Sequence, residues 1–526
     1  MIDVTIRTAD ESPRSERRVV RSCRRSSAQR SVAFAAAVML MLPAATRAAA
    51  QPVAVTKTNP TKVYMHYMPW FETPATLGGS NWGLHWQMAT QNPNIVDGQG
   101  RRQIASHFYP QIGPYASSDP DVIEYHLLLM KLAGIDGVLI DWYGVQGTNG
   151  DIGSLLANSN ALVDRVDDFG LNFGVVLEDR FAANVSQASA NVAYLRDNYF
   201  NQSSYIRSGA GDDPLLLTFG PITFQQESQW TQILSQAGED VDLLTLWYES
   251  GDAGANADGE YAWAYQDSLS YDQHIANFYK YRAPGQDTAG GIAFPGFDDF
   301  YQEGGWGSGI PFEIPHDVGQ TLATTLDLAT QYASQIDFLQ LATWNDFGEG
   351  TMFEPTVETG FDYLLQLQQF TGVEYGEAEL QLVYDLYRAR KKYLGNAAVQ
   401  AQLDEASDDL AALDLGGAKA ILETLSLPGD FNGDDAANGA DFLAWQRQWG
   451  DVGYYPLNML AADGNADGVV DAADFAMLQS NFGRTIQAGA QNSVPEPSGR
   501  VIAATLAVIS LALAGVSGRP HSAFSP

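Results

Sequence analysis

The middle of the chain alternates short apolar runs with longer amphipathic runs. Eight apolar runs have the length of strands: 63–68, 137–142, 173–177, 214–219, 243–247, 262–265, 291–294 and 338–343. Between them, apolar residues recur with helical spacing in 121–132, 154–167, 187–199, 224–236, 271–281 and 321–335. This alternation predicts a parallel sheet with helical crossovers. Eight such units favour a closed (β/α)8 barrel of the TIM type, in the α/β class, over an open doubly wound sheet.

The predicted strands end repeatedly in acidic and aromatic residues. The residues at these ends are Tyr64, His66, Trp70, Asp141, Trp142, Tyr143, Glu178, Trp247, Tyr248, Glu249, Trp344, Asn345, Asp346 and Glu349. Taken singly, each residue is more typical of packing, and Glu178 could pair with Arg180. Five ends with the same composition favour a site at the face where barrels carry their chemistry. Rings stack on the apolar faces of sugars, and carboxylates transfer protons, so the pattern favours a sugar site.

Two acids, Asp346 and Glu349, lie three residues apart just after the last predicted strand. On a tight turn, this spacing can direct both carboxylates into one cleft. Glycosidases need such a pair, one acid to protonate the leaving oxygen and one to act as base or nucleophile. Two close carboxylates also separate each other's pKa values, which keeps one protonated near neutral pH.

The segment 344–355 resembles the catalytic segment of glycoside hydrolase family 99, which reads Trp-Asn-Glu-x-x-Glu-Gly-Thr-x-x-Glu-Pro. Segments 107–119 and 134–144 and residue Glu178 also match this family of endo-α-mannosidases and endo-α-mannanases. The resemblance implies that Glu349 is the general acid/base and that Asp346 is its partner. In the family, the partner acts as base on the sugar 2-hydroxyl, which gives an epoxide-like intermediate and net retention. We expect these residues to contact sugar: Glu178, Trp142, Tyr143, Tyr64, His66, Trp70, Trp344 and Asn345.

Asp346 stands where family 99 has glutamate. An aspartate there is similar to family 71, the α-1,3-glucanases, whose segment reads Trp-Asn-Asp-x-Gly-Glu. The sequence therefore predicts an endo-acting glycoside hydrolase for an α-linked polysaccharide of mannan or glucan type. The alternatives are a non-catalytic carbohydrate-binding surface protein on the same fold and a calcium-dependent adhesion protein.

The charge of the chain narrows the choice of partner. It has 29 Lys and Arg against 63 Asp and Glu, for a net charge of −34. Such a surface repels phosphate backbones, which argues against nucleic acid as a partner. No Gly-x-Gly-x-x-Gly or Gly-Lys-Ser/Thr loop follows an early strand, so nothing favours nucleotide binding.

Two acidic loops follow a helical linker segment, predicted at 373–427. The predicted ligands are Asp430, Asn432, Asp434, Asn438 and Asp441 in the first loop and Asp463, Asn465, Asp467, Asp471 and Asp474 in the second. Oxygen ligands at this spacing are typical of calcium loops, which place glycine at position 6; Asp435 holds that position in the first loop. Two loops 33 residues apart resemble a type I dockerin at 428–485, a module that docks to cohesin-like partners. We expect structural Ca²⁺ there and no cofactor for catalysis.

Both ends of the chain resemble sorting signals. Residues 1–50 place a basic region, a short apolar run and small residues in the order of a signal peptide. Cys23, the one cysteine, lies within it, which leaves the remainder without disulfides or thiolate metal sites. The barrel is expected at 51–372, a linker at 486–493 and a sorting signal at 494–526. Val-Pro-Glu-Pro-Ser at 494–498, an uncharged run at 501–518 and Arg519 resemble the PEP-CTERM signal. That resemblance implies a transmembrane helix, processing machinery at the membrane, and delivery to the cell surface or matrix; a plain anchor is the alternative.

Overall fold

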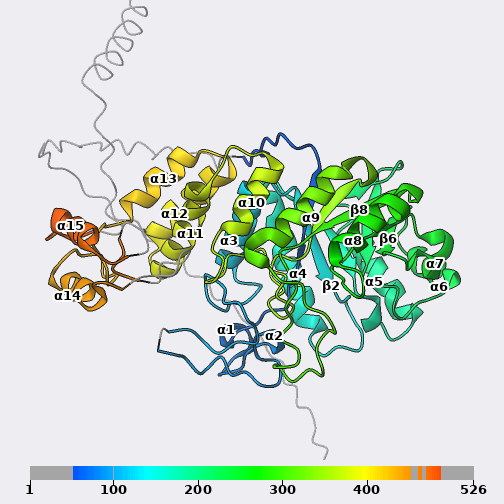
Figure 1. Ribbon diagram of the computed structural model, residues 1–526, viewed down its shortest axis with the longest axis horizontal. Coiled ribbons are helices and arrows are strands. Elements are labelled where there is room, and N and C mark those ends of the chain that lie inside the picture. Colours follow the sequence, from blue (N-terminus) through cyan, green and yellow to red (C-terminus); the bar gives the residue numbers. More distant parts are fainter. Residues whose placement is uncertain (1–50, 99, 452–459, 465–468, 487–526) are drawn as a thin grey trace, which may run out of the picture. The chain divides into compact units, whose positions relative to one another are not determined.

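The computed structural model describes residues 51–98, 100–451, 460–464 and 469–486. Eight parallel strands form its centre: β1 (Lys62–Tyr67), β2 (Gly137–Trp142), β3 (Asn172–Leu177), β5 (Asp213–Thr218), β6 (Asp242–Leu246), β7 (Gly259–Tyr261), β8 (Thr288–Ala293) and β9 (Phe338–Leu341). They are hydrogen-bonded in the order β3-β2-β1-β9-β8-β7-β6-β5, and pairing of β3 with β5 closes the ring. The predicted (β/α)8 barrel is therefore confirmed (Figure 1).

Helices cross over between most of these strands, as the apolar periodicity indicates. They are α3 (Pro120–Leu132), α4 (Ile152–Val166), α5 (Val185–Asn198), α6 (Glu227–Leu234), α8 (Tyr271–Asn277) and α9 (Gln320–Gln331), and α10 (Asp362–Thr371) follows the last strand. Helix α3 begins where the Asp119 carboxylate accepts a hydrogen bond from the Asp121 backbone N–H, with Pro120 in the first turn. This helix is apolar on nearly all sides because it lies between the barrel and a further helix.

Strand β7 lies before the range that the apolar pattern predicts, at Gly259–Tyr261 rather than 262–265. The polar Glu260 hides the strand in the sequence. In the structure its side chain is fully buried and forms a two-point ion pair with Arg282, with Nε 2.7 Å from Oε2. Gly259 is required because a Cβ there would lie 1.7 Å from the Thr288 carbonyl oxygen.

Apolar side chains fill the barrel interior below its polar end. Leu139, Val176, Leu215, Leu217 and Leu244 form one cluster from neighbouring strands. Because this layer is closed, solvent and ligand reach the barrel from the C-terminal strand ends, where the acidic residues lie.

Three helices follow the barrel: α11 (Glu377–Lys392), α12 (Ala397–Ala411) and α13 (Leu415–Thr424). Their apolar side chains belong to the same hydrophobic core as the barrel helices. Arg390 of α11 pairs with the buried Glu124 of α3 at 2.8 Å and with Asp404 of α12 at 2.6 Å. The three helices are therefore packed on the barrel through α3. Loss of Arg390 would leave the buried Glu124 carboxylate without its partner.

Two short helices, α14 (Gly439–Gln448) and α15 (Ala472–Asn481), each follow an acidic loop. Phe431, Ala437, Ala462, Val470 and Leu478 form the small core between them. Among the described residues, no helix has the length and apolarity that a bilayer span requires. The expected signal peptide at 1–50 and sorting signal at 494–526 lie outside the described residues.

Candidate active site

A cavity of about 200 Å³ opens at the C-terminal ends of the barrel strands. Four carboxylates line it: Asp141 from β2, Glu178 after β3, and Asp346 and Glu349 after β9. Arg180 is the one basic residue among the lining side chains that carry a fixed charge. The cavity therefore has an excess of acidic groups in a confined volume.

A tight turn brings Asp346 and Glu349 to the same cavity. The Asp346 backbone N–H donates to Thr343 Oγ1 at 2.8 Å, and the Glu349 N–H donates to Asp346 Oδ1 at 2.9 Å. The Asp346 carboxylate thus closes the turn that carries Glu349. Gly350 ends the turn with φ +65°, and a Cβ there would lie 2.7 Å from the Asp298 carbonyl oxygen.

Burial changes the protonation of both acids. Burial raises the pKa of Asp346, and backbone N–H groups of Glu349 and Gly348 oppose this rise. Burial and then the charge of Asp346 raise the pKa of Glu349, while a hydrogen bond from the Tyr301 hydroxyl to Glu349 Oε1, 2.9 Å long, opposes it. The backbone N–H groups therefore favour the ionised form of Asp346, and the Asp346 charge in turn favours the protonated form of Glu349.

Glu178 forms a two-point ion pair with Arg180. Nε and Nη2 of Arg180 lie 2.7 Å from Oε2 and Oε1 of Glu178. Burial raises the pKa of Glu178, and the Arg180 guanidinium opposes this. The Arg180 guanidinium, the one fixed positive charge of the cavity, is thus paired with Glu178, which leaves the other three acids without a cationic partner there.

Asp141 and His66 are neighbours at the cavity wall, and several of their buried polar atoms have no hydrogen-bond partner. Both His66 ring nitrogens and Asp141 Oδ2 are buried and unpaired, and His66 Nε2 is 4.0 Å from Asp141 Oδ1. Burial raises the pKa of Asp141 well above its usual range, the charge of Glu178 raises it further, and burial lowers the pKa of His66 to about 3. Unpaired buried polar atoms at a cavity wall indicate groups that a bound polar ligand completes.

Six of the ten residues predicted for the site line the cavity: Asp346, Glu349, Glu178, Tyr143, His66 and Trp70. The other four do not. Tyr64 packs on Phe338 inside the barrel, and Trp142 stacks on Tyr194 at 5.9 Å.

Trp344 and Asn345 are fully buried behind the turn. The Asn345 amide bonds to the backbone N–H and carbonyl of Met68, at 2.8 and 3.0 Å. It therefore joins the end of β1 to the turn after β9, which is a structural task rather than contact with the cavity.

A buried polar network under the turn holds the last acid of the motif, Glu354. Tyr115 donates to Glu354 Oε2 at 2.6 Å, and His126 Nε2 lies 3.3 Å from Oε1. The other His126 nitrogen lies 3.0 Å from the Tyr67 hydroxyl. The motif thus contains one acid that supports the site from outside the cavity.

Several lining residues escaped the sequence reasoning: Arg180, Tyr301, Trp306, His85, Phe219 and Trp263. Tyr301 and Trp306 lie in the long connection after β8, where no motif or periodicity marks them. Asp141 stands at a strand end in the sequence, which was the available signal, but its neighbours Trp142 and Tyr143 have more typical sugar-site side chains.

The first acidic loop has the geometry of a cation site. Carboxylate oxygens of Asp430, Asp434 and Asp441 all lie within 4.8 Å of one another. Oxygens on opposite sides of a Ca²⁺ ion are about 5 Å apart, twice the Ca–O distance, so this set fits calcium. The two Asp441 oxygens accept backbone N–H groups of Phe431 and Asn438 at 2.8 Å each.

The second loop repeats this arrangement where it is described. Asp474 accepts the backbone N–H groups of Gly464 and Asp471 at 2.7 Å each, as Asp441 does in the first loop. Asp463, Asp471 and Asp474 are described, whereas the predicted ligands Asn465 and Asp467 lie outside the described residues.

Asp435, at the glycine position of the first loop, adopts φ +65°. Its carboxylate binds Lys392 Nζ at 2.6 Å and accepts a hydrogen bond from the Tyr393 hydroxyl at 2.6 Å. A side chain is tolerated in this strained conformation because it ties the loop to the end of α11.

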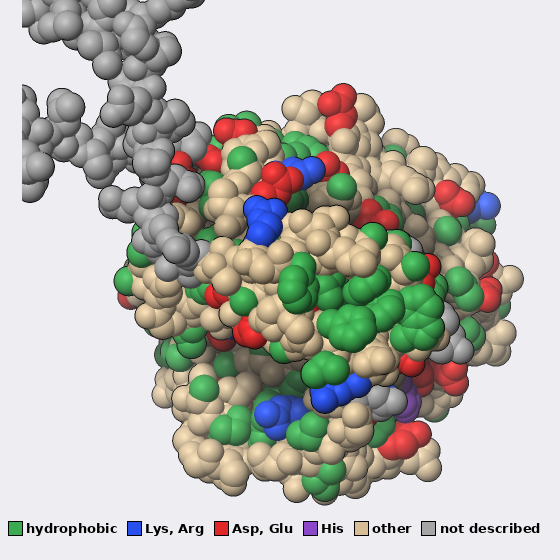
Figure 2. All heavy atoms as spheres, turned by 90° about the vertical axis from the view of Figure 1, so that its left-hand side faces the viewer, with side chains coloured by type: hydrophobic (Ala, Val, Ile, Leu, Met, Phe, Trp, Pro, Cys, Tyr) green, Lys and Arg blue, Asp and Glu red, His purple; other side chains and the backbone are tan. Residues whose placement is uncertain are grey.

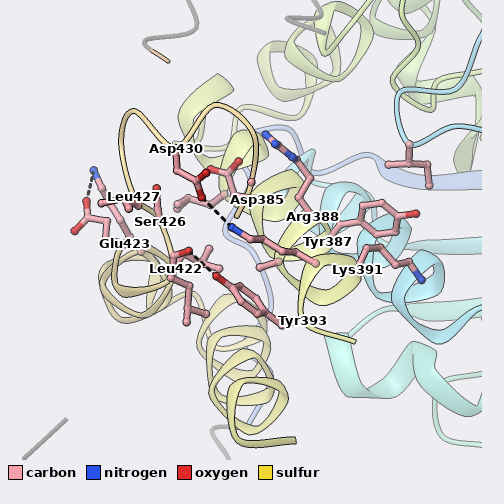
Figure 3. Close-up of a pocket in the computed structure, with 17 residues that line it drawn as sticks. Asp385, Tyr387, Arg388, Lys391, Tyr393, Leu422, Glu423, Ser426, Leu427 and Asp430 are labelled. Atoms are coloured by element: carbon pink, nitrogen blue, oxygen red, sulfur yellow. Dashed lines mark hydrogen bonds and ion pairs between the residues drawn. The ribbon is translucent and has the colours of Figure 1, made fainter. Parts of the chain in front are cut away.

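A cavity of about 700 Å³ lies beside this contact, lined by α11, α13 and the first loop (Figure 3). Its three lysines form ion pairs: Lys391 with Asp119 and Asp121, each at 2.7 Å, Lys392 with Asp435 of the loop at 2.6 Å, and Lys419 with Glu423 at 3.9 Å. Among its lining residues, Asp430 and Glu423 are paired with lysines, so this cavity does not offer two free carboxylates for catalysis.

Apolar side chains gather on the face seen from the side of α14 and α15 (Figure 2). Leu443, Trp449 and Phe482 are exposed large hydrophobic residues of this module. An exposed apolar group of this kind is typical of a protein-binding surface.

Two parts of the chain are similar in sequence to known protein families. Residues 59–249 match the model of glycosyl hydrolase family 99, and residues 428–483 match the type I dockerin domain. The chain is 25% identical over 190 residues to a glycoprotein endo-alpha-1,2-mannosidase-like protein of Mus musculus, covering 34% of this chain and 41% of that protein. It is 28% identical over 156 residues to glycoprotein endo-alpha-1,2-mannosidase of Rattus norvegicus, covering 28% and 33%. The chain thus spans less than half the length of these two relatives.

One solved structure is the GH99 endo-alpha-mannosidase of Bacteroides thetaiotaomicron. It aligns with 61% of this chain and 98% of its own, at 18% identity and a TM-score of 0.48. These matches make residues 59–249 similar to glycosyl hydrolase family 99 and residues 428–483 similar to the type I dockerin domain.

Proposed function

We propose that the protein is an exported, endo-acting glycoside hydrolase that cleaves an α-linked polysaccharide of mannan or glucan type. The observation that carries this proposal is the pair Asp346 and Glu349, held by one turn in one barrel-end cavity. The family 99 match and the name endo-alpha-1,2-mannosidase of the relatives support α-mannoside as the first substrate to test.

The surroundings of the two acids support one base and one protonated acid, as the reaction requires. Asp346, as the base, accepts the proton of the sugar 2-hydroxyl while that oxygen attacks the anomeric carbon. Glu349 donates its proton to the glycosidic oxygen, which leaves as a hydroxyl group. In the second step, Glu349 takes a proton from water, the water oxygen bonds to the anomeric carbon as the bond between that carbon and the 2-oxygen breaks, and Asp346 returns the proton to the 2-oxygen. Two displacements give a product of retained configuration.

Asp346 also supports a second route through the same pair. If its carboxylate attacks the anomeric carbon directly, a covalent glycosyl-enzyme forms, and retention results again. If it activates water instead, the product is inverted. Asp346 is one methylene shorter than the family's glutamate, and it already accepts a hydrogen bond from the Glu349 N–H. The choice between these routes therefore has to be measured for this chain.

A polysaccharide panel tests the proposal. Protein comprising residues 51–490 is incubated with α-mannans and α-glucans of defined linkage, and reducing ends and the anomer of the first product are measured. Release of oligosaccharides in the middle size range supports endo cleavage, and the anomer selects the route. No release from any polysaccharide, together with retention on one of them in a pull-down, would leave the non-catalytic carbohydrate-binding protein as the better description.

We further propose that the C-terminal module binds structural Ca²⁺ through the two acidic loops and docks to a cohesin-like partner. Asp430, Asp434 and Asp441 supply hard oxygen ligands in the first loop. The dockerin match supports a location outside the cytoplasm or at the cell surface. Retention at the membrane by a C-terminal segment and its processing remain part of this proposal.

A further inference from the structure

Residues 294–316 connect β8 to the next helix and border the candidate active site. On one side, this connection is hydrogen-bonded to the turn that carries Asp346 and Glu349. The Asp298 backbone N–H donates to the Glu349 carbonyl at 2.9 Å, and the Phe300 N–H donates to the Gly348 carbonyl at 2.8 Å. The position of this connection is therefore tied to the position of Glu349.

The other side of the connection is bonded to the segment after α2 (Leu84–Gln87). The Ala89 N–H donates to the Gly304 carbonyl, and the Thr90 hydroxyl donates to the Glu303 carbonyl, both at 2.8 Å. Within the connection, the Asp299 carboxylate accepts the N–H groups of Tyr301 and Ile310, both at 2.9 Å. The loop is thus bonded along both edges, so the rings it carries have defined positions.

Four rings from these two segments and from β1's end form a continuous wall of the cavity, which we call the aromatic ledge: Trp70, His85, Trp306 and Tyr301. Trp70 and His85 are stacked with centroids 4.0 Å apart and planes at 6°. His85 meets Trp306 edge-on at 5.8 Å, and Trp306 lies over Tyr301 at 5.8 Å and 27°. Trp306 is 37% exposed, so an indole ring is presented at the mouth of the cavity.

The ledge lies on the Glu349 side of the acid pair, because Tyr301 both donates to Glu349 and lies under Trp306. A general acid must lie next to the oxygen that leaves. A sugar ring beyond that oxygen therefore lies toward the ledge. The C–H face of a pyranose is apolar, and an exposed indole offers the matching surface and an electron-rich face.

We propose that the aromatic ledge is a stacking subsite, centred on Trp306, for the neutral sugar ring on the leaving-group side of the cleaved bond. This rests on the proposed hydrolase function and deepens it. The ring must be uncharged because the cavity has four carboxylates and its one guanidinium is paired with Glu178. Uronic or sulfated sugars would bring further negative charge to a site with no free cation among its lining residues.

The test compares two substrates that differ in the leaving group. Wild type, Trp306→Ala and Trp306→Phe are assayed on α-mannotetraose and α-glucotetraose and on the matching α-glycosyl fluorides, whose leaving fluoride has no ring to stack. We expect Trp306→Ala to lower kcat/KM on the tetraose about tenfold or more, the fluoride to lose much less, and Trp306→Phe to recover part of the loss. Tyr281→Ala removes a 71% exposed ring of another surface segment and serves as the matched control.

Equal losses on tetraose and fluoride, or no loss on either, would overturn the ledge assignment while leaving the hydrolase proposal intact. If wild type releases sugar from neither substrate, the hydrolase proposal fails, and calorimetry with the same tetraoses then decides the ledge. Weaker binding by Trp306→Ala than by wild type would support a stacking subsite. Equal binding, or no binding by wild type, would reject it.

Discussion

Two clusters of acidic residues in this protein have the same chemical groups but differ in how their carboxylates are arranged and compensated. In the barrel, Asp141 and Asp346 are buried, and burial raises the pKa of both carboxyls. In the first acidic loop, Asp430, Asp434 and Asp441 converge on one point, and Asp434 is exposed. The first environment favours carboxyls that hold and transfer protons, and the second favours carboxylates that gather around a cation.

The difference lies in what compensates each charge. The barrel cavity supplies one guanidinium for four largely buried acids, so a bound proton is the further compensation available to their charge. The loop supplies backbone N–H groups to Asp441 and carboxylate oxygens within 4.8 Å of one another, a spacing that suits a hard divalent ion. Chemistry is thus assigned by burial and geometry rather than by residue type.

The largest effect is expected when the barrel acids can no longer hold or transfer protons. Glu349→Gln and Asp346→Asn keep the size of each side chain and should each lower kcat about 10³-fold or more, because acid and base act only in the transition state. Asp327→Asn, on an exposed position of α9, is the control and should leave kcat unchanged. Either site variant with wild-type turnover would remove that residue from the proposed mechanism, provided that circular dichroism shows an unchanged fold.

A smaller effect is expected from the loops, and it concerns stability. Calcium at about 100 times its Kd stabilises a single site by about 2.7 kcal/mol. Hydrogen exchange of the peptides from 428–451 and 469–486 should slow when calcium is added, and the barrel peptides should change little. Asp441→Asn should abolish this protection in its own loop, because it removes one of the converging carboxylates. Protection that is independent of calcium in the wild type would contradict the metal assignment.

The barrel and the positions of its acids could be predicted from the sequence because the spacing of apolar residues marks the strands and the acids follow directly after strands. Apolar strand runs mark the ring, and barrel chemistry lies at strand ends, so Asp346, Glu349 and Glu178 could be found by place alone. Strand β7 was missed because its buried Glu260 is compensated by Arg282, a partner more than twenty residues away. No local pattern records such a pair.

The same reason explains the mixed outcome for the aromatic residues. Trp142 and Tyr143 are adjacent, yet one stacks on Tyr194 in the core and the other lines the cavity. Neighbours on a strand point to opposite faces, and composition alone does not say which face is the site. Tyr301 and Trp306 depend on a long loop whose path is set by hydrogen bonds to Gly348 and to the α2 segment, and this information is tertiary.

A still smaller effect should appear in the pH dependence of barrel stability. The raised pKa of Asp141 means that the folded state retains a proton that the unfolded chain releases above pH of about 4. Its contribution to stability is therefore lost as pH rises from that value through the folded pKa. Asp141→Asn should raise the melting temperature more at pH 8 than at pH 4, by a few degrees.

Glu260→Gln is the matched comparison with the opposite sign. Burial acts to raise the pKa of Glu260, but hydrogen bonds from Arg282, Ser250 and Tyr248 leave it lowered. Its contribution is present above the unfolded pKa and lost as pH falls through the folded pKa, so this variant should lose more stability at pH 8 than at pH 4. The same pH response in both variants would contradict the contrast between compensated and uncompensated acids.

The smallest expected effect isolates one hydrogen bond to the proposed acid. Tyr301 donates to Glu349 Oε1 at 2.9 Å and holds the pKa of Glu349 below the level that burial and Asp346 would set. Tyr301→Phe removes this donor, so Glu349 should keep its proton to higher pH. The alkaline limb of the kcat/KM profile should then move upward by less than about one unit, while the acidic limb, set by Asp346, moves less. Tyr205→Phe deletes a buried hydroxyl that bonds the Leu215 carbonyl away from the cavity and should leave both limbs in place. A downward shift of the alkaline limb would show that Tyr301 stabilises the protonated form, and the roles of acid and base in the pair would have to be reassigned.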